Sequence, residues 1–150
     1  MMTEIYKQNL LIGEEYQDFV VERLYEIGLA VISYSSKRYQ NIKGENKNGW
    51  EIKYDRKFRE TRNLYIEVEE KTNKNNKNFV KSGIFRVDNT WLYIIGDYKT
   101  IYILSKTQLQ RCYKKNRYKI VQTLTSIGML IPILVVDKFL CLKRIDIVNK

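Results

Sequence analysis

The sequence predicts a mixed α/β fold in a single domain, and three observations support this prediction. The chain has 150 residues, which is the length of one domain and enough to bury a sizeable core. A helical pattern comes first, and two segments with strand-like alternation follow it. A basic helix and further β-rich runs then complete the chain, with no repeat, linker or domain boundary between them.

The first predicted element is an amphipathic helix over residues 13–27. Its apolar residues recur at spacings of three and four, which places them on one face of a helix. Gly28 follows directly and suits the left-handed conformation that ends many helices. The predicted buried face consists of Tyr16, Phe19, Val20, Leu24 and Ile27.

Two segments, 50–55 and 63–69, alternate charged residues with large apolar ones. On a β-strand, alternation with a period of two places the two kinds of side chain on opposite faces. Both segments are therefore predicted to be strands with one apolar and one polar face. The polar faces carry Glu51, Lys53 and Asp55 in the first segment, and Glu67 and Glu69 in the second.

The second half of the chain predicts a hairpin, a helix and further strands. Two β-branched runs within residues 90–104 flank a turn that contains Gly96, which is a hairpin signal. Ser105 is placed to cap a basic helix that extends to about Lys115. Residues 118–148 contain two or three more strand-like runs, and Pro132 is expected at an edge or a bend.

The charge of the chain favours a polyanionic partner. It has 27 Lys and Arg against 17 Asp and Glu, a formal net charge of +10, which favours nucleic acid most of all. Acidic residues nevertheless crowd between positions 45 and 70, whereas none occurs from 98 to 136. The basic residues predicted to form a phosphate-contacting surface are Lys106, Arg111, Lys114, Lys115 and Arg117.

The residues that are missing exclude several kinds of chemistry. The chain has two cysteines and no histidine, which excludes structural zinc sites built from four cysteines, or from cysteine and histidine together, within one chain. The absence of histidine also excludes Ser-His and Cys-His nucleophilic catalysis. Proton transfer is therefore expected to use Lys, Glu, Asp, Tyr or a metal ion.

No targeting or membrane segment is apparent. The N-terminus lacks the basic and apolar regions of a secretory signal. The longest apolar run, 127–136, is about half the ~20 residues that a membrane helix requires. We therefore expect a soluble, intracellular (cytoplasmic) protein with no membrane partner.

An acidic cluster within a basic chain suits metal-assisted phosphodiester chemistry. A carboxylate and a lysine two residues apart on one strand face, such as Glu51 and Lys53, can hold a divalent metal and orient a water. The acidic cluster attracts cations, while the basic surroundings attract phosphate. The pattern predicts a metal-dependent nuclease, a hydrolase acting on phosphodiester bonds, and the resemblance described next narrows this to a DNA endonuclease.

The ordered set of motifs resembles a known superfamily. Gly13-Glu14-Glu15-Tyr16-Gln17 on a helix precedes Glu51-Ile52-Lys53-Tyr54-Asp55, Asn63-Leu64-Tyr65-Ile66-Glu67, Ser82-Gly83-Ile84-Phe85 and Trp91-Leu92-Tyr93-Ile94. This set is similar to small phage-type members of the PD-(D/E)xK, or restriction-endonuclease-like, nucleases. The resemblance covers residues 13–109 and leaves the C-terminal forty residues unmatched. It implies a central mixed β-sheet flanked by helices, with DNA over the acidic strands and a possible homodimer.

The resemblance also implies roles for individual residues. Glu51 and Lys53 match the Glu-x-Lys element, and Glu45 stands near the superfamily's first acid, although that acid is more often Asp. Mg²⁺ (or Mn²⁺), as one ion or two, would be held by Glu45, Glu51 and the Ile52 carbonyl, while Lys53 would orient or activate water. Gln17 stands where a helical glutamate is common. Asp55 could orient Lys53 or reach a second metal, and Glu67 is an auxiliary candidate.

Two alternatives stay open at this point. Glu69-Glu70-Lys71 is a second Glu-x-Lys element, for which Asp55 would be the upstream acid. The chain could instead be a non-catalytic nucleic-acid-binding protein whose acidic strands form a solvated face with cross-strand ion pairs. RNA is an alternative nucleic acid under either interpretation.

Overall fold

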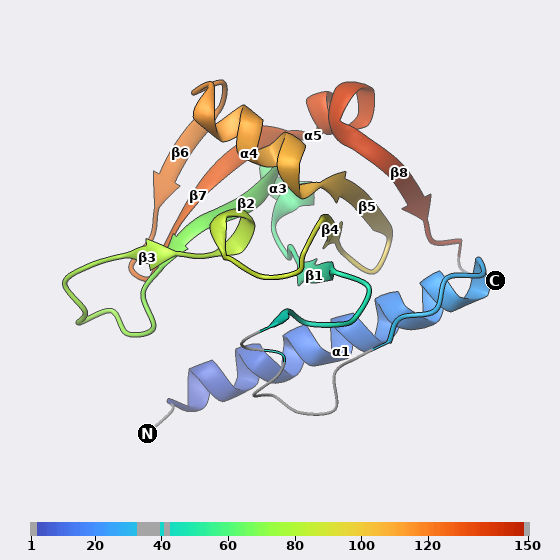
Figure 1. Cartoon of the computed structure of the whole chain (residues 1–150), viewed down its shortest axis with the longest axis horizontal. Helices are drawn as coiled ribbons and strands as arrows, with labels where there is room; N and C mark the ends of the chain where they lie inside the picture. The colour runs from blue at the N-terminus through green and yellow to red at the C-terminus, as the bar shows by residue number, and fades with distance from the viewer. Residues whose placement is uncertain (1–2, 33–39, 41–42, 149–150) are drawn as a thin grey trace.

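The computed structural model describes residues 3–32, 40 and 43–148, and it contains two four-stranded sheets together with helices (Figure 1). The predicted mixed α/β class is confirmed. The strands form two sheets, however, and not the one central sheet that the resemblance implied. The strand orders are β1-β4-β5-β8 in the first sheet and β3-β2-β7-β6 in the second.

The first sheet is mixed and the second is antiparallel. In the first sheet β1 pairs in parallel with β4, while β4 with β5 and β5 with β8 are antiparallel pairs. The first sheet comprises β1 (Trp50–Tyr54), β4 (Leu92–Gly96), β5 (Thr100–Ser105) and β8 (Cys141–Asp146). The second comprises β2 (Asn63–Glu70), β3 (Val80–Lys81), β6 (Lys119–Gln122) and β7 (Ser126–Pro132).

A sharp corner between β1 and β2 separates the two sheets. The short helix α3 (Phe58–Thr61) follows β1 and ends at Arg62, whose φ of 57° lies in the left-handed region. Asp55 fixes this corner, because its carboxylate accepts the backbone N–H of Lys57 at 3.0 Å and that of Tyr65 at 2.9 Å. The chain therefore leaves the first sheet at Asp55 and starts a new one.

Helix α1 (Glu4–Glu26) covers the outer face of the first sheet (Figure 1). The predicted helix over 13–27 is confirmed, but it begins earlier, where the Thr3 side chain accepts the Tyr6 N–H at 3.2 Å. Tyr16, Val20 and Leu24 are fully buried, as their spacing predicted, and Phe19 is partly buried. Ile27 was predicted to be buried but is 45% exposed, because the helix ends at Glu26 and Ile27 caps it. Together with the first sheet, Tyr16, Val20 and Leu24 form one core cluster, which also contains Ile52, Ile94 and Ile101.

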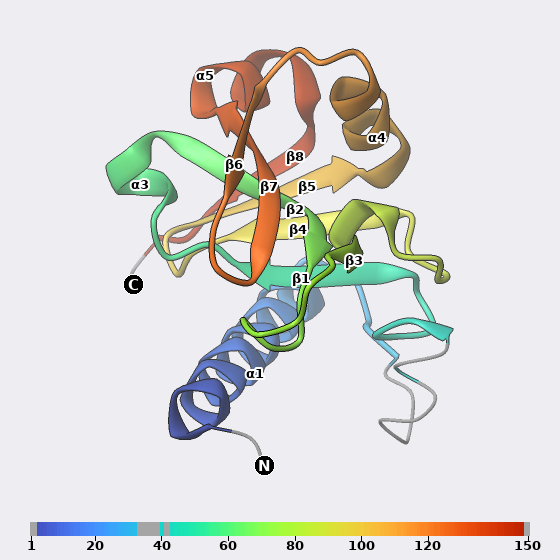
Figure 2. The ribbon, with the colours of Figure 1, turned by 90° about the vertical axis from the view of Figure 1, so that its left-hand side faces the viewer.

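A second core cluster lies between the two sheets. The inward side chains of β4 and β5, such as Tyr93 and Leu104, meet Leu64, Ile66 and Met129 of the second sheet. Figure 2 shows α1 and the second sheet on opposite sides of β1 and β4. The first sheet is thus covered on both faces, which explains why β4 and β5 consist of nearly continuous apolar residues.

The remaining predicted elements are also present. The predicted hairpin is β4 and β5, and the predicted basic helix is α4 (Lys106–Lys114), capped where Ser105 accepts the Gln108 N–H at 3.3 Å. Pro132 ends β7. Three short turns complete the fold: the 3₁₀ turn η1 (Gly83–Phe85), helix α5 (Ile133–Val135) and the π turn η2 (Val136–Leu140). Among the described helices, none combines the length and apolar character needed to cross a membrane.

Candidate active site

The site lies along the outer edge of β1, where no neighbouring strand of the described chain pairs. The residues just before β1 satisfy this edge with their side chains. Glu45 Oε2 accepts the backbone N–H of Ile52 at 3.1 Å. The amide of Asn46 both accepts from the Trp50 N–H, at 3.0 Å, and donates to the Trp50 carbonyl, at 2.6 Å. The upstream loop is therefore bound to the strand edge, and it holds Glu45 beside the Glu-x-Lys element.

Gly44 allows the loop to approach its neighbours this closely. Its φ is +128°, and an added Cβ would lie 1.7 Å from Oδ1 of Asn89. The Asn89 amide in turn donates to the Asn46 carbonyl at 2.8 Å. A side chain at position 44 would therefore displace the contacts that place Glu45.

Glu51 and Lys53 lie on the same face of β1, as the alternation predicted. The Lys53 Nζ lies 3.0 Å from Glu51 Oε1, and the Glu51 side chain is only 3% exposed while that of Lys53 is 42% exposed. Glu51 Oε2 has no hydrogen-bond partner among the described residues, nor does the buried hydroxyl of Tyr93, which is opposite Glu51 in the strand register. A buried carboxylate oxygen without a partner is costly in free energy, so it is well suited to bind a cation.

The charges in this cluster act strongly on one another. Burial raises the pKa of the Glu45 carboxyl to about 7; Lys53 and the Ile52 N–H oppose this rise, and Glu51 adds to it. Burial disfavours the charged form of Lys53, but Glu51, Glu45 and Glu67 outweigh burial and hold the pKa of its ammonium above the ordinary value. Lys53 is therefore a firmly protonated cation among carboxylates.

Glu67 of β2 lies close enough to this cluster for its charge to act on Lys53. It is held by two hydroxyls, since Ser82 donates to its Oε2 at 3.1 Å and Ser126 to its Oε1 at 3.2 Å. A β-bulge lies next to it, because Glu67 pairs with Gly128 and Glu69 with Ile127, which leaves Val68 as an extra residue. Burial raises the pKa of the Glu67 carboxyl, although Lys53 and the two serines oppose this effect.

Gly83 seats η1 against β2 at this point. Its φ is +53°, and an added Cβ would lie 2.0 Å from the Glu67 carbonyl oxygen. The close approach places Ser82 beside the Glu67 carboxylate. The Ser-Gly-Ile-Phe segment identified in the sequence therefore supports an acidic side chain of the site.

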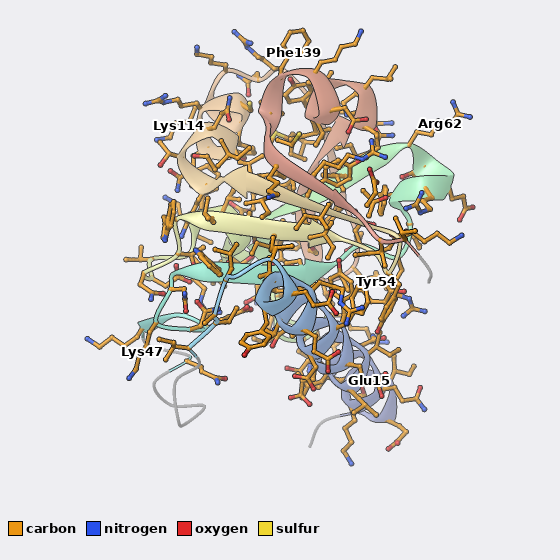
Figure 3. All side chains as sticks on the ribbon, turned by 90° about the vertical axis from the view of Figure 1, so that its right-hand side faces the viewer. Glu15, Lys47, Tyr54, Arg62, Lys114 and Phe139 are labelled. Carbon is orange, nitrogen blue, oxygen red and sulfur yellow. The ribbon has the colours of Figure 1, made fainter. Side chains whose placement is uncertain are left out.

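A cavity of about 420 Å³ opens between α1 and the β1 edge. Its lining brings together Gln17, Glu45, the Ile52 backbone edge, Lys53 and Arg56. The carbonyl of Ile52 faces this edge because the N–H and C=O of one residue point to the same side of a strand. Figure 3 shows Tyr54 beside α1 and Glu15 on the outer side of that helix. The cavity thus brings Gln17 of the helix together with Glu45 and Lys53, whereas Glu51 is not among its lining residues.

The structure does not support the role predicted for Asp55. Its two carboxylate oxygens accept backbone N–H groups of Lys57 and Tyr65, and so hold the corner between the sheets. It is not among the charges that act most strongly on Lys53. Asp55 is a structural residue here because the chain turns away directly after Tyr54.

The alternative Glu-x-Lys element is not assembled. Asp55 binds Tyr65 near the start of β2, and Glu69 lies four residues further on, about 13 Å along the strand at 3.3 Å per residue. Glu69 pairs with Lys81, and the Lys71 ammonium lies 4.4 Å from the centre of the Phe79 ring. The Glu51-x-Lys53 element is the one that lies close to its upstream acid, Glu45.

The predicted basic surface needs one correction. Lys106 is 7% exposed, and its ammonium donates to the Arg86 carbonyl at 2.7 Å and to Asp88 at 3.1 Å. It faces the interior because it occupies the first turn of α4 against the chain that leads into β4. Lys114 lies on the far side of the molecule from α1 (Figure 3). The other four predicted residues, Arg111, Lys114, Lys115 and Arg117, are exposed.

Sequence reasoning gave no individual role to four residues that shape the site: Asn46, Ser82, Tyr93 and Ser126. Tyr93 and Ser126 come from strands that are distant in the sequence, and no local pattern indicates that they meet Glu51 and Glu67. Asn46 is different. An Asn four residues before a predicted strand is a usable signal, because asparagine amides readily replace backbone partners.

Two carboxylates and a main-chain carbonyl form the candidate metal ligands: Glu45, Glu51 and the Ile52 carbonyl. Within the described ranges, no group of three or more Asp, Glu, Cys or His side chains is arranged to hold a metal. The smaller set still suits a hard cation such as Mg²⁺, which commonly takes one or two carboxylates and completes its shell with water. The unpartnered Glu51 Oε2 supports this fit.

Comparisons of the chain with protein-family models, with curated proteins and with solved structures found no match.

Proposed function

We propose that the protein is a metal-dependent DNA endonuclease with its active site at the edge of β1. One observation carries this proposal: a buried Glu51 oxygen without a partner among the described residues lies near Glu45 and a protonated Lys53, and both of these neighbours line an open cavity. The formal charge of +10 supports a polyanionic substrate. Clusters of carboxylates with strongly shifted pKa values in a cleft are typical of functional sites.

The proposed ligands of Mg²⁺ or Mn²⁺ are Glu45, Glu51 and the Ile52 carbonyl. A cation would remove the cost of the unpartnered Glu51 oxygen and favour the ionised form of Glu45, whose pKa is raised to about 7. When bound, Mg²⁺ would offset negative charge that develops on the phosphate and make water more acidic. The protein would supply the orientation of the substrate and the remaining charges.

Lys53 is proposed to act as a cation and not as a base. Three carboxylates keep the pKa of its ammonium high, so it holds its proton at neutral pH. A protonated lysine at the mouth of the cavity would orient water and stabilise charge on the phosphate in the transition state. Glu67 would position Lys53 through its charge. Gln17, on the facing helix, would orient a water or the substrate.

The restriction-endonuclease-like assignment belongs to the same proposal. It rests on α1 packed over β1, on the Glu-x-Lys element of β1 and on the β4–β5 hairpin beside that strand. A phage-type protein that acts inside the cell, as a homodimer with one site for each DNA strand, would fit this assignment.

A non-catalytic nucleic-acid-binding protein is the second candidate. The Glu51–Lys53 ion pair favours it, because the pair already offsets one charge of the site without a metal. This candidate predicts salt-sensitive binding that EDTA leaves unchanged, and no cleavage. The exposed residues Arg111, Lys114, Lys115 and Arg117 would then carry most of the binding.

Cleavage assays separate the two candidates. Supercoiled plasmid, a branched DNA oligonucleotide and an RNA of matched sequence would be incubated with Mg²⁺, Mn²⁺ or EDTA. The proposal predicts metal-dependent cleavage that falls at least about 100-fold in Lys53→Ala and in Glu51→Gln. Lys74→Ala, which changes an exposed lysine that does not line the cavity, serves as the control and should cleave normally. Binding without cleavage in every metal would select the second candidate.

A further inference from the structure

A second cavity, of about 550 Å³, lies beside the corner between β1 and β2. We call it the arginine pocket after three of its lining residues, Arg59, Arg62 and Arg144. It shares no lining residue with the cavity at the β1 edge. Its volume is within the range of small-molecule sites.

Two of the arginines are stacked on aromatic rings. The Arg59 guanidinium lies 5.0 Å from the centre of the Phe58 ring, and that of Arg144 lies 5.7 Å from the Tyr102 ring. The two rings contact each other edge to face, with centres 6.0 Å apart. Both rings are buried, whereas the two guanidiniums remain partly exposed. Each guanidinium therefore rests one face on a ring and leaves the other open.

A hydrogen-bond network fixes these two guanidiniums by their edges. Arg59 donates to Asp97 at 3.1 Å and to the Thr100 hydroxyl at 2.7 Å. Thr100 donates to Asp146 at 3.2 Å, and Asp146 accepts from Arg144 at 3.0 Å. Arg144 also donates to Asp137 at 3.0 Å. The network orients the two cations before any ligand arrives, which lowers the entropic cost of binding.

Arg62 differs from the other two arginines. Among the described residues, nothing forms a hydrogen bond or ion pair with its side chain, and it lies exposed at the rim, where Figure 3 labels it. Its backbone has a φ of 57°, a conformation that most non-glycine residues avoid and that is enriched at functional sites. Arg59 and Arg144 are paired with three carboxylates, Asp97, Asp137 and Asp146, so Arg62 is the one arginine of this pocket without a carboxylate partner among the described residues.

The arginine pocket also has apolar lining residues. Pro132, Ile133 and Leu134 line it, and the Leu134 side chain is 72% exposed. Flat cationic faces and aliphatic side chains in one pocket suit a planar ring, since nucleobases stack on guanidinium planes. A single cation at the rim suits one phosphate and does not match a di- or triphosphate.

We propose that the arginine pocket binds one nucleotide unit, with the base against Arg59 and Arg144 and a single phosphate at Arg62. The unit could be a free nucleoside monophosphate or an unpaired nucleotide at the end of a nucleic-acid strand. This site goes beyond the proposed nuclease activity, because it needs neither a metal nor the residues of the β1 edge.

Calorimetric titrations with EDTA present test this site. The ligands would be adenosine and uridine 5′-monophosphate, adenosine, inorganic phosphate, and a 5′-phosphorylated single-stranded tetranucleotide, with the Glu51→Gln protein as a second background. The proposal predicts that both monophosphates bind, that adenosine binds about tenfold more weakly, and that phosphate alone gives no measurable binding. Tighter binding of the tetranucleotide would identify a strand end as the ligand, and tighter binding of the monophosphates a free nucleotide.

Arg62→Gly is the most informative variant. Glycine accepts the left-handed conformation without strain, so the variant loses the guanidinium and keeps the fold. Affinity for the monophosphates should fall about tenfold, while Lys74→Ala, which changes an exposed lysine between β2 and β3, should leave binding normal. Unchanged binding in Arg62→Gly, equal binding of phosphate and monophosphate, or no binding of any nucleotide to the folded protein would overturn the proposal.

Discussion

The Lys53 ammonium lies 3.0 Å from Glu51 Oε1, and the other oxygen of the same buried carboxylate has no partner among the described residues. One oxygen of the Glu51 carboxylate holds the cationic lysine in place, and we propose that the second binds a metal ion. The pair is stable only while the lysine stays charged, which the neighbouring carboxylates ensure.

The effects of Glu51 and Lys53 substitutions on the free energy of unfolding should depend strongly on each other. In Lys53→Met the Glu51 carboxylate would stay buried without its cation. We therefore expect the free energy of unfolding to fall by about 2 kcal/mol. This is less than for a fully buried pair, because Lys53 is 42% exposed. Urea denaturation would measure the change. The double variant Lys53→Met/Glu51→Gln should regain part of the loss, and additive single effects would contradict the coupling.

Glu45 should make the metal-free protein sensitive to pH. Its pKa is about 7 in the fold, against an ordinary value of 4.5 in the unfolded chain. A raised folded pKa contributes stability that is fully present below pH 4.5 and is lost as the pH rises to about 7. Relative to Glu45→Gln, wild type in EDTA should therefore lose up to about 3 kcal/mol across this range, at about 1.4 kcal/mol per pKa unit.

Thermal unfolding of both proteins from about pH 4 to about pH 8 would check this difference. At the upper end of the range, Mg²⁺ should restore the stability of wild type, because it binds the ionised carboxylate, and should have little effect on Glu45→Gln. A constant difference between the two proteins over the whole range would show that Glu45 ionises normally.

Asp55 should affect stability and leave metal affinity unchanged. Asp55→Ala leaves two backbone N–H groups at the sheet corner, those of Lys57 and Tyr65, without an acceptor. We expect a loss of about 2 kcal/mol in chemical denaturation. The affinity for Mn²⁺ should stay within about twofold of wild type, because Asp55 is not a proposed ligand. A large loss of metal affinity in a folded Asp55→Asn protein would instead restore its predicted role as a ligand.

Arg56 should contribute to DNA binding, whereas Lys106 should not. Lys106→Met breaks a buried ion pair with Asp88, so it should cost about 3 kcal/mol of stability and leave the salt dependence of binding unchanged. Arg56 is exposed at the cavity beside the site, so Arg56→Ala should reduce the salt slope by about one. DNA titrations at several salt concentrations compare the two variants directly. A changed slope in Lys106→Met, or an unchanged one in Arg56→Ala, would contradict this assignment.

Local pattern was enough to predict the strands of the site but not how they assemble. Period-two alternation placed Glu51 and Lys53 on one face of β1, and the structure has them there. The same alternation in β2 is also correct, yet β2 belongs to a different sheet. Strand pairing depends on distant partners, here β4 for β1 and β7 for β2, which no local window contains.

Asp55 and Lys106 were assigned wrongly for the same reason, because their partners are set by the folded structure. Asp55 and Lys106 look like site residues in the sequence because they are charged and close to the right segments. In the structure the Asp55 carboxylate accepts the backbone N–H groups of residues 57 and 65. The Lys106 ammonium forms an ion pair with Asp88. Tyr93 had no individual role in the sequence motif that contains it, and only the register of β1 with β4 brings it opposite Glu51.

Metal binding at Glu51 is the central claim, and Mn²⁺ titration followed by electron paramagnetic resonance tests it most directly. Wild type would be compared with Glu51→Gln and with Glu60→Gln, which changes an exposed acid on α3. The account predicts that Mn²⁺ binds wild type and Glu60→Gln equally, and Glu51→Gln at least about tenfold more weakly. Equal binding by all three proteins, or no binding by wild type, would contradict a metal site at the edge of β1.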